Sequence, residues 1–312
     1  MSLIPMPVAE LKALINKLRT FTKLCSEGMT LNILTHLLTV CLVFLFSAVV
    51  SWAADANSLI FQGADLHYRG NLEEAMASFQ AAVKLEPRNE YAHNQLGIIY
   101  ARKERFDDAF REFSLVASID QQNTFALLWL GILNLQKNNL DKGYENFQKI
   151  IQADPDNADA YYYLGAIYNI RHNPAKAIEY LKKSRDADAK EADTHFRLGK
   201  AFRQVDMVKN AQLEYGRVLA LNNSYSAARN EMGWLYYNAG DYAAAFAEWQ
   251  MSLKTNPRDS DAIFSLARGY NEQAWKAYKK GNQQDASSYW KKVLTVDPEN
   301  KAAKYYLGKQ TK

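Results

Sequence analysis

The residue types that most often carry chemistry are placed unfavourably in this chain of 312 residues. The only cysteines, Cys25 and Cys41, lie upstream of residue 55, so the rest of the chain has no thiol for a disulfide, a zinc site or a nucleophile. The histidines further on do not fall at ligand spacing on one helix, and these are His67, His93, His172 and His195. Neither a phosphate-binding glycine loop nor an H-E-x-x-H motif occurs, and no serine or carboxylate lies in a recognisable nucleophile context. We therefore expect no catalytic residue, no metal site and no cofactor.

Composition and charge narrow the class of protein further. The hydrophobic share of 48% and the charged share of 23% are close to the averages of soluble globular chains, which predicts a mostly folded protein. The formal charge of +4 is small and no long block of one sign occurs, so nucleic acid is not expected as a partner. The length fits two ordinary domains or one extended repeat array.

An apolar segment covers residues 31–53, where 23 residues carry no formal charge apart from a possible proton on His36. A helix of about 20 such residues crosses the hydrocarbon core of a bilayer. Basic residues precede the segment, whereas the first basic residue after it is Arg69. The positive-inside rule then predicts that the leader, residues 1–30, is cytoplasmic and that everything after Ala53 is exported.

Two outcomes for this segment stay open. Ser51 and Ala53 are small residues at the −3 and −1 positions of a signal-peptidase site, which would give a cleaved, soluble periplasmic protein. The long leader favours an uncleaved membrane anchor, because its apolar residues have the spacing of an amphipathic surface helix: Val8, Leu11, Ile15 and Leu18. Because of this leader, we favour the anchor over cleavage. We also favour it over an ordinary buried helix, because 23 apolar residues exceed what a core helix needs.

The elements of the exported part are set by a 34-residue period. Glycines recur at that interval: Gly63, Gly97, Gly131, Gly165, Gly199 and Gly233. A small residue follows each glycine after 12 positions, and a large apolar residue follows four positions later: Phe79, Phe113, Phe147, Leu181, Tyr215 and Trp249. Three positions after the first-helix anchor most units carry a large apolar or aromatic residue, and the third unit instead has Asn134: the others are Leu66, Tyr100, Tyr168, Phe202, Tyr236 and Tyr270.

This pattern resembles the tetratricopeptide repeat, with its leading L-G, its A-x-x-x-F and its closing proline. The L-G pairs are Leu96-Gly97, Leu130-Gly131, Leu164-Gly165 and Leu198-Gly199, and prolines close four units at Pro87, Pro155, Pro257 and Pro298. The resemblance implies an all-α, right-handed superhelix of about seven helix-turn-helix repeats over residues 56–300, with repeats starting near residues 56, 90, 124, 158, 192, 226 and 260. Residues 301–312 are expected to form a capping helix. The seventh unit has seven extra residues, which predicts a first helix that runs to about Lys280.

The resemblance also implies a binding groove on the inner face of the first helices. The candidate groove residues are Tyr91, Phe125, Trp129, Tyr162, Tyr163, Phe196, Arg197, Lys200, Arg203, Trp234 and Tyr237, with Phe61 and Phe264 at matching positions. Each aromatic residue has an alternative role in packing between repeats. For Arg197, Lys200 and Arg203, a solvated face is favoured over a carboxylate-binding site.

These observations predict a non-enzymatic scaffold, membrane-anchored with its repeats exported, that binds protein or peptide partners in the assembly of an envelope or secretion complex. An accessory subunit of a polysaccharide or cell-wall synthase is an alternative, and a cytosol-facing import receptor is another. Residues 31–53 would contact the membrane, and no small-molecule substrate is expected.

Overall fold

The computed structural model describes residues 56–310, and every regular element within that range is a helix. The predicted leader and the apolar segment 31–53 lie outside the described residues. Across residues 56–310, none of the helices combines the length and the apolar character needed to cross a membrane.

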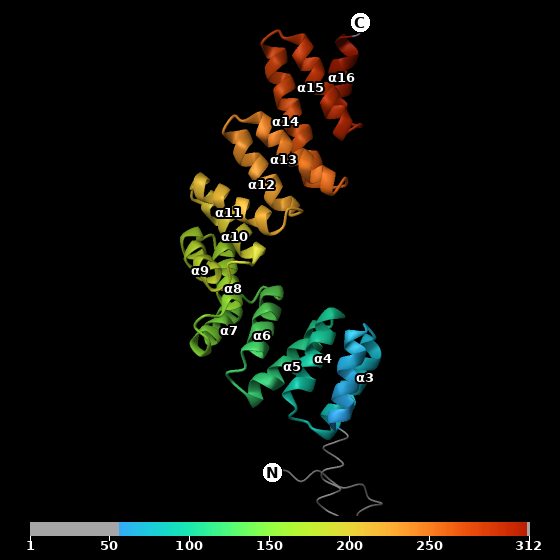
Figure 1. Cartoon of the computed structure of the whole chain (residues 1–312), viewed down its shortest axis with the longest axis vertical. Coiled ribbons are helices and arrows are strands. Elements are labelled where there is room, and N and C mark those ends of the chain that lie inside the picture. The colour runs from blue at the N-terminus through green and yellow to red at the C-terminus, as the bar shows by residue number, and fades with distance from the viewer. Residues whose placement is uncertain (1–55, 311–312) are drawn as a thin grey trace, which may run out of the picture. The chain divides into compact units, whose positions relative to one another are not determined.

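The described part divides into two compact units, the first ending at Ile119 and the second beginning at Asp120. The first unit contains the helix 56–68, α3 (Leu72–Leu85), α4 (Glu90–Arg102) and α5 (Phe106–Ile119). The second unit contains α6 (Thr124–Gln136), α7 (Leu140–Ala153), α8 (Ala158–Ile170), α9 (Pro174–Ala187), α10 (Ala192–Gln204), α11 (Val208–Leu221), α12 (Ser226–Asn238), α13 (Tyr242–Thr255), α14 (Ser260–Lys279), α15 (Gln283–Val296) and α16 (Lys301–Gln310). Within each unit, consecutive helices pack as antiparallel pairs (Figure 1).

Several first helices begin at a polar capping residue. Asn89, Asn123 and Asn157 recur every 34 residues, and each side chain accepts a hydrogen bond at 3.0 Å from the backbone N–H three residues later. Asp259 and Asn300 cap α14 and α16 in the same way. Such caps satisfy N–H groups that have no partner inside the helix, so they fix where these helices start.

The turn from the first to the second helix needs a residue in the left-handed region of φ. Glycine fills this position in three repeats, at Gly70, Gly240 and Gly281. Four other repeats place a larger residue there: Glu104, Asn138, His172 and Asp206. Left-handed φ is costly for most residues with a Cβ and less costly for Asn and Asp, so the turn at Glu104 carries clear backbone strain.

The two helices of a repeat approach closely because a glycine lies against a large side chain. A Cβ on Gly97 would lie 2.6 Å from the ring of Phe113, and one on Gly233 would lie 2.2 Å from Nε1 of Trp249. Both large side chains are fully buried. The spacing of glycine and large apolar residue therefore corresponds to direct contact between the paired helices.

In the third repeat the buried polar residue Asn134 replaces the usual aromatic residue. Its amide donates a hydrogen bond to the side-chain oxygen of Asn146 on α7 at 3.2 Å. A buried polar group is tolerated when it has such a partner, so this departure from the repeat pattern leaves the helix pair intact.

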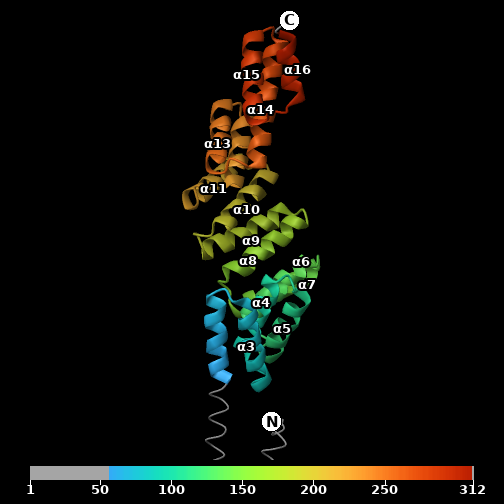
Figure 2. The ribbon, with the colours of Figure 1, turned by 90° about the vertical axis from the view of Figure 1, so that its right-hand side faces the viewer.

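The seventh repeat has a longer first helix, as the seven extra residues predict. Helix α14 has 20 residues and ends at Lys279. Its added turns carry Trp275 and Tyr278, which pack against Trp290 of α15 and Tyr306 of α16. A view turned by 90° shows α14, α15 and α16 side by side at the C-terminal end (Figure 2).

Candidate functional site

Several predicted groove residues of the second unit contact one another, either within one first helix or between neighbouring first helices. At the start of this series, Phe125 and Trp129 lie one turn apart on α6 with their rings edge to face at 6.5 Å. Phe125 is 41% exposed, whereas Trp129 is half-buried. Helix α6 thus offers one apolar ring at the surface, supported by a second.

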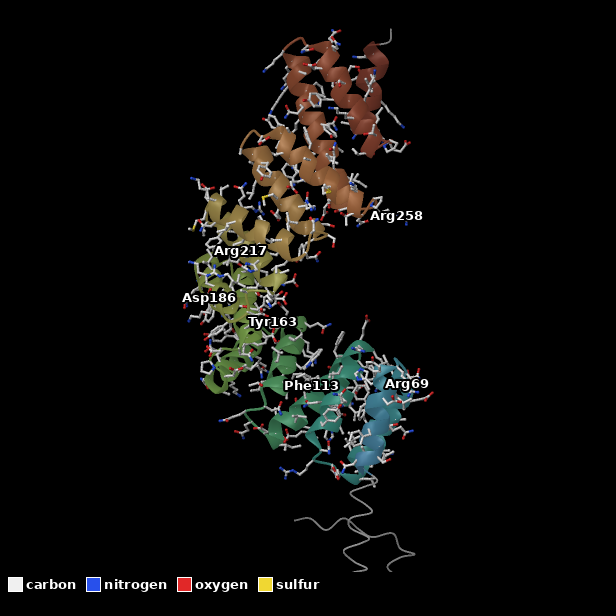
Figure 3. The ribbon with its side chains drawn as sticks, in the orientation of Figure 1. Arg69, Phe113, Tyr163, Asp186, Arg217 and Arg258 are labelled. Atoms are coloured by element: carbon white, nitrogen blue, oxygen red, sulfur yellow. The ribbon has the colours of Figure 1, made fainter. Side chains whose placement is uncertain are left out.

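On α8 the two adjacent tyrosines have different surroundings. Tyr163, labelled in Figure 3, stacks on Phe147 with ring centroids 5.0 Å apart and an angle of 8° between the rings. Burial raises the pKa of Tyr163, and the neighbouring Tyr162 and Asp159 raise it further. Tyr162 lies edge-on to Tyr163 and receives a hydrogen bond on its hydroxyl from Nε of Arg197 at 2.6 Å. These rings therefore join α8 to its neighbours and expose only part of their faces.

The basic turn predicted on α10 is largely engaged by other first helices. The guanidinium of Arg197 lies 4.8 Å from the centre of the Tyr162 ring, and Arg203 pairs with Glu231 of α12 at 3.2 Å. Lys200 remains exposed, with its amine above the ring of Phe196. Phe196 itself packs against Tyr215 and Tyr225. The three cations therefore do not present a common surface for a carboxylate.

On α12 the predicted groove residues serve packing more than surface. Trp234 lies 4.9 Å from Trp249 between ring centres, and the guanidinium of Arg268 lies 5.0 Å from the Trp234 ring. Tyr237 is only 7% exposed, and its hydroxyl donates to Glu272 of α14 at 2.8 Å. Burial raises the pKa of Tyr237, and its hydrogen bond to Glu272 adds to the increase. Tyr237 therefore does not offer its ring to a partner.

The most exposed ring at a groove position of the second unit is Phe264 on α14, which is 63% exposed. In the first unit, Phe61 and Tyr91 are exposed on first helices, Phe61 at 77%. These residues and Phe125 are the apolar surface that the groove positions provide in the described range.

A pocket of about 230 Å³ lies at the beginnings of α8 and α10, beside the end of α9. Tyr162 and Tyr163 form its aromatic wall, and its other lining includes four carboxylates, Asp159, Asp188, Glu191 and Asp193. The hydroxyl of Tyr225 donates to Asp193 at 2.5 Å. Sequence reasoning missed these carboxylates, although Asp159 and Asp193 occupy the second position of successive repeats.

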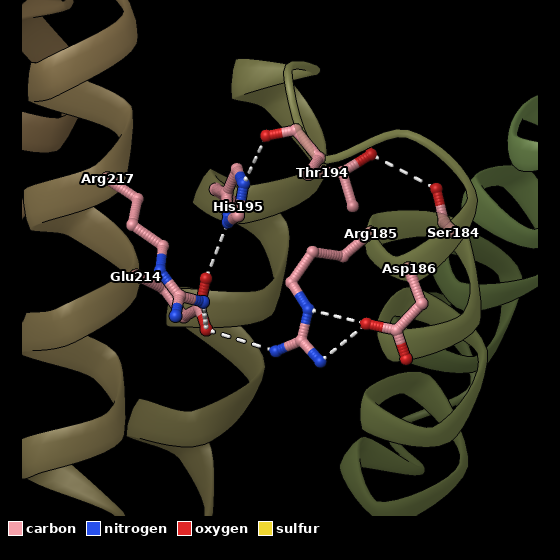
Figure 4. Close-up of polar contacts among 8 residues, drawn as sticks. Ser184, Arg185, Asp186, Thr194, His195, Glu214 and Arg217 are labelled. Atoms are coloured by element: carbon pink, nitrogen blue, oxygen red, sulfur yellow. Dashed lines mark hydrogen bonds and ion pairs between the residues drawn. The ribbon is translucent and has the colours of Figure 1, made fainter.

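A buried polar cluster joins α9, α10 and α11 (Figure 4). Glu214 lies at its centre, with His195 Nδ1 at 2.6 Å, Arg217 at 2.8 Å and Arg185 at 3.4 Å. His195 and Glu214 are almost fully buried. The hydrogen bonds and attraction of Asp186 and Glu214 outweigh burial and raise the pKa of Arg185. The cluster links α9, α10 and α11 through Arg185, His195 and Glu214.

Candidate metal ligands do not gather anywhere within residues 56–310, where no group of three or more His, Cys, Asp or Glu side chains could hold an ion. Within the described residues, several first helices carry an exposed aromatic ring. Polar contacts link neighbouring first helices of the second unit. The fold therefore defines an α-solenoid class of protein, built from repeated helix pairs.

The comparisons with known proteins place the chain within that class. Residues 63–104 match a family model described as TPR repeat, and residues 125–157 and 146–179 match models described as tetratricopeptide repeat. No curated protein matches the sequence. The matched residues are tetratricopeptide repeats, and the helix pairs of residues 56–310 have the fold that such repeats form.

Solved structures show the same fold at low sequence identity. The C-terminal part of a TPR repeat-containing protein from Cytophaga hutchinsonii has a TM-score of 0.65 at 18% identity, covering 80% of this chain and 99% of that one. The structure of pilF from Pseudomonas aeruginosa has a TM-score of 0.62 at 17% identity, covering 70% and 99%. A tetratricopeptide repeat protein from Parabacteroides merdae has a TM-score of 0.58 at 16% identity, covering 82% and 98%.

Proposed function

We propose that this protein is an exported, membrane-tethered scaffold that holds polypeptide partners against the first-helix faces of its repeats during assembly of an envelope or secretion complex. The repeat class supports binding of proteins or peptides. Export and tethering rest on the apolar segment 31–53 and on the basic residues before it.

The observation that carries the binding surface is the exposure of large apolar rings at groove positions. Phe125 on α6 and Phe264 on α14 project from the faces that the repeat pattern assigns to binding. Exposed large apolar rings are typical of surfaces that a partner covers. Trp234 is a poor probe of this surface, because its replacement would disturb the packing of Trp249.

A photo-reactive residue at position 264 of the full chain tests contact with a partner in cells. We expect a cross-linked product from position 264 and none from position 213, because Leu213 is 55% exposed but lies on the second helix α11. Equal cross-linking from both positions would show that the groove face has no preference for the partner.

Substitutions at the same positions measure how much the rings of Phe125 and Phe264 contribute to partner affinity. We expect Phe125→Ala with Phe264→Ala to weaken partner binding roughly ten-fold or more, as aromatic residues central to an interface do. Leu213→Ala should leave binding unchanged. If circular dichroism shows an intact fold and the double variant binds as well as the parent, the aromatic surface is not the binding site.

The topology has its own test. In intact spheroplasts, we expect added protease to digest the repeat region, since the proposal places it outside the cytoplasm. A repeat region that is degraded only after lysis would contradict export and would favour the cytosol-facing receptor. The N-terminal sequence of the mature protein decides between an anchor and cleavage after Ala53.

A further inference from the structure

The fourth residue of the first helix is a histidine or an arginine in three repeats, at His93, His195 and Arg229. Each contacts a glutamate 19 residues later on the second helix and a backbone carbonyl six residues earlier in the loop before the repeat. The same side chain therefore joins the incoming loop to the second helix of its repeat. The other four of the seven repeats have neither residue at this position: Leu59, Leu127, Tyr161 and Ile263.

The contacts of His93 require a proton on both ring nitrogens. Nδ1 lies 2.6 Å from Oε2 of Glu112, and Nε2 lies 3.1 Å from the carbonyl oxygen of Pro87. The carbonyl oxygen and the ionised carboxylate can only accept a hydrogen bond, so both nitrogens must donate. A neutral imidazole has a single N–H and loses one of the two contacts.

Arg229 shows the permanently charged form of the same arrangement. Its Nη1 donates to Glu248 at 2.9 Å, and its Nε donates to the carbonyl of Asn223 at 3.2 Å. Arginine stays protonated at every physiological pH, so this repeat keeps both contacts.

The His195 arrangement differs because Arg185 and Arg217 also pair with Glu214. The carboxylate of Glu214 therefore has two guanidinium partners besides His195. For His93, Glu112 of α5 is the charged group that faces the ring in the described residues, while the nearby Glu86 of the loop accepts a hydrogen bond from Asn89.

The electrostatics of His93 agree with this geometry. Burial lowers the pKa of His93, but the hydrogen bonds to Glu112 and the Pro87 carbonyl and the attraction of Glu112 outweigh it, so the pKa is raised above 6.5. Because the folded pKa lies above the unfolded value of 6.5, the stabilisation is complete below pH 6.5 and is lost as the pH rises through the raised folded pKa.

We propose that His93 is a proton-dependent clamp, whose protonated ring ties the Pro87 loop to α5 and releases that loop when the pH rises. The clamp belongs to the first unit and is independent of the groove residues of the second. It makes the start of α4 the part of this repeat whose order depends on pH.

Hydrogen exchange of the full chain, purified in detergent, tests the clamp. It is measured at about pH 6 and about pH 8.5, which lie below and above the ordinary histidine pKa of 6.5. After correction for intrinsic exchange, we expect protection around residues 86–93 to fall roughly ten-fold at the higher pH, the factor that corresponds to one charge-assisted hydrogen bond. The loop before α12, held by Arg229, serves as the internal control and should keep its protection.

Two reciprocal variants decide the cause. His93→Arg should abolish the pH-dependent fall, and Arg229→His should create one in the loop before α12. Circular dichroism confirms folding, and if His93→Arg does not fold, the comparison of Arg229→His with the parent protein still decides. An unchanged fall in His93→Arg, or no new fall in Arg229→His, would overturn the proposal.

Discussion

At the scale of single residues, the fit between Gly233 and Trp249 shows what the repeat pattern selects. The indole of Trp249 is fully buried, and its Nε1 donates to the carbonyl of Asn230 at 3.2 Å, inside the helix that also carries Gly233. A Cβ on Gly233 would lie 2.6 Å and 2.7 Å from two further atoms of the indole. The absence of a side chain is therefore what allows this ring to reach the backbone of its partner helix.

Gly233→Ala should destabilise the sixth repeat. The rigid indole must shift and the Asn230 hydrogen bond must weaken, which we expect to cost about 1–3 kcal/mol, as overpacking of a core does. Native-state hydrogen exchange of α12 and α13 measures this loss.

Gly216→Ala is the matched control. Gly216 lies inside α11 with no atom within 4 Å of the position of its Cβ, so alanine should stabilise the helix by about 0.5–1 kcal/mol. If both alanine variants change the local stability by similarly small amounts, the Trp249 indole can move at little cost.

Glu104→Gly addresses strain in the turn between α4 and α5. Glu104 has a φ of 58°, a conformation that costs residues with a Cβ roughly 1–2 kcal/mol. We expect glycine to stabilise the second repeat by up to about 1 kcal/mol, since its own chain entropy offsets part of the gain. The thermal midpoint of the full chain should rise, and an unchanged or lower midpoint would contradict the strain.

The candidate site could be predicted from the sequence only in part. The repeat pattern assigns positions to the groove face, and Phe264 and Phe125 are exposed there. The burial of Tyr237 could not be predicted, because it depends on Glu272 and on the close approach of α14. The spacing of one repeat contains no information about how far the next repeat covers it.

At the scale of elements, the extension of α14 packs against the next two helices of its unit. Trp275 lies 4.7 Å from Tyr306 and 5.9 Å from Trp290 between ring centres, and Trp290 stacks on Tyr306 at 4.9 Å. The two extra turns thus supply an aromatic contact for both α15 and α16.

Trp275→Ala should loosen α16 before any other helix. We expect a loss of about 2–4 kcal/mol in the local stability of α15 and α16, because a large ring is removed from a packed cluster. Hydrogen exchange resolved by helix measures it. Tyr305→Ala on α16 is the control, since that ring is 54% exposed and contacts only the edge of the cluster at Tyr306, so its loss should have a smaller effect.

The order and length of the helices were predictable, because a fixed period, glycines at the close contacts and an extension of whole turns define them. The partners of the extension were not predictable in the same way. Periodicity places Trp275 and Tyr278 beyond the usual end of a first helix, but only the packing of α15 and α16 shows which side chains they meet.

At the scale of the whole molecule, stability within the second unit is a sum over neighbouring helices. Gly165→Leu should disturb α8 and α9 first, since a Cβ there would already lie 2.6 Å from Cγ of Leu181. We expect the loss of hydrogen-exchange protection to decrease along the stack and to be smallest in α14, α15 and α16. A uniform loss across the second unit would show that its repeats unfold as one cooperative body.

Three hydrogen bonds in the second unit connect first helices of successive repeats across 35 residues each: Arg197 to Tyr162, Tyr237 to Glu272 and Ser265 to Asn230. These hydrogen bonds fix the distance between neighbouring first helices. Under the proposed function, a partner that forces the repeats apart must break these hydrogen bonds, whereas a partner that matches their spacing leaves them in place. We therefore expect the second unit to bind partners whose contact points match a spacing that is set before binding.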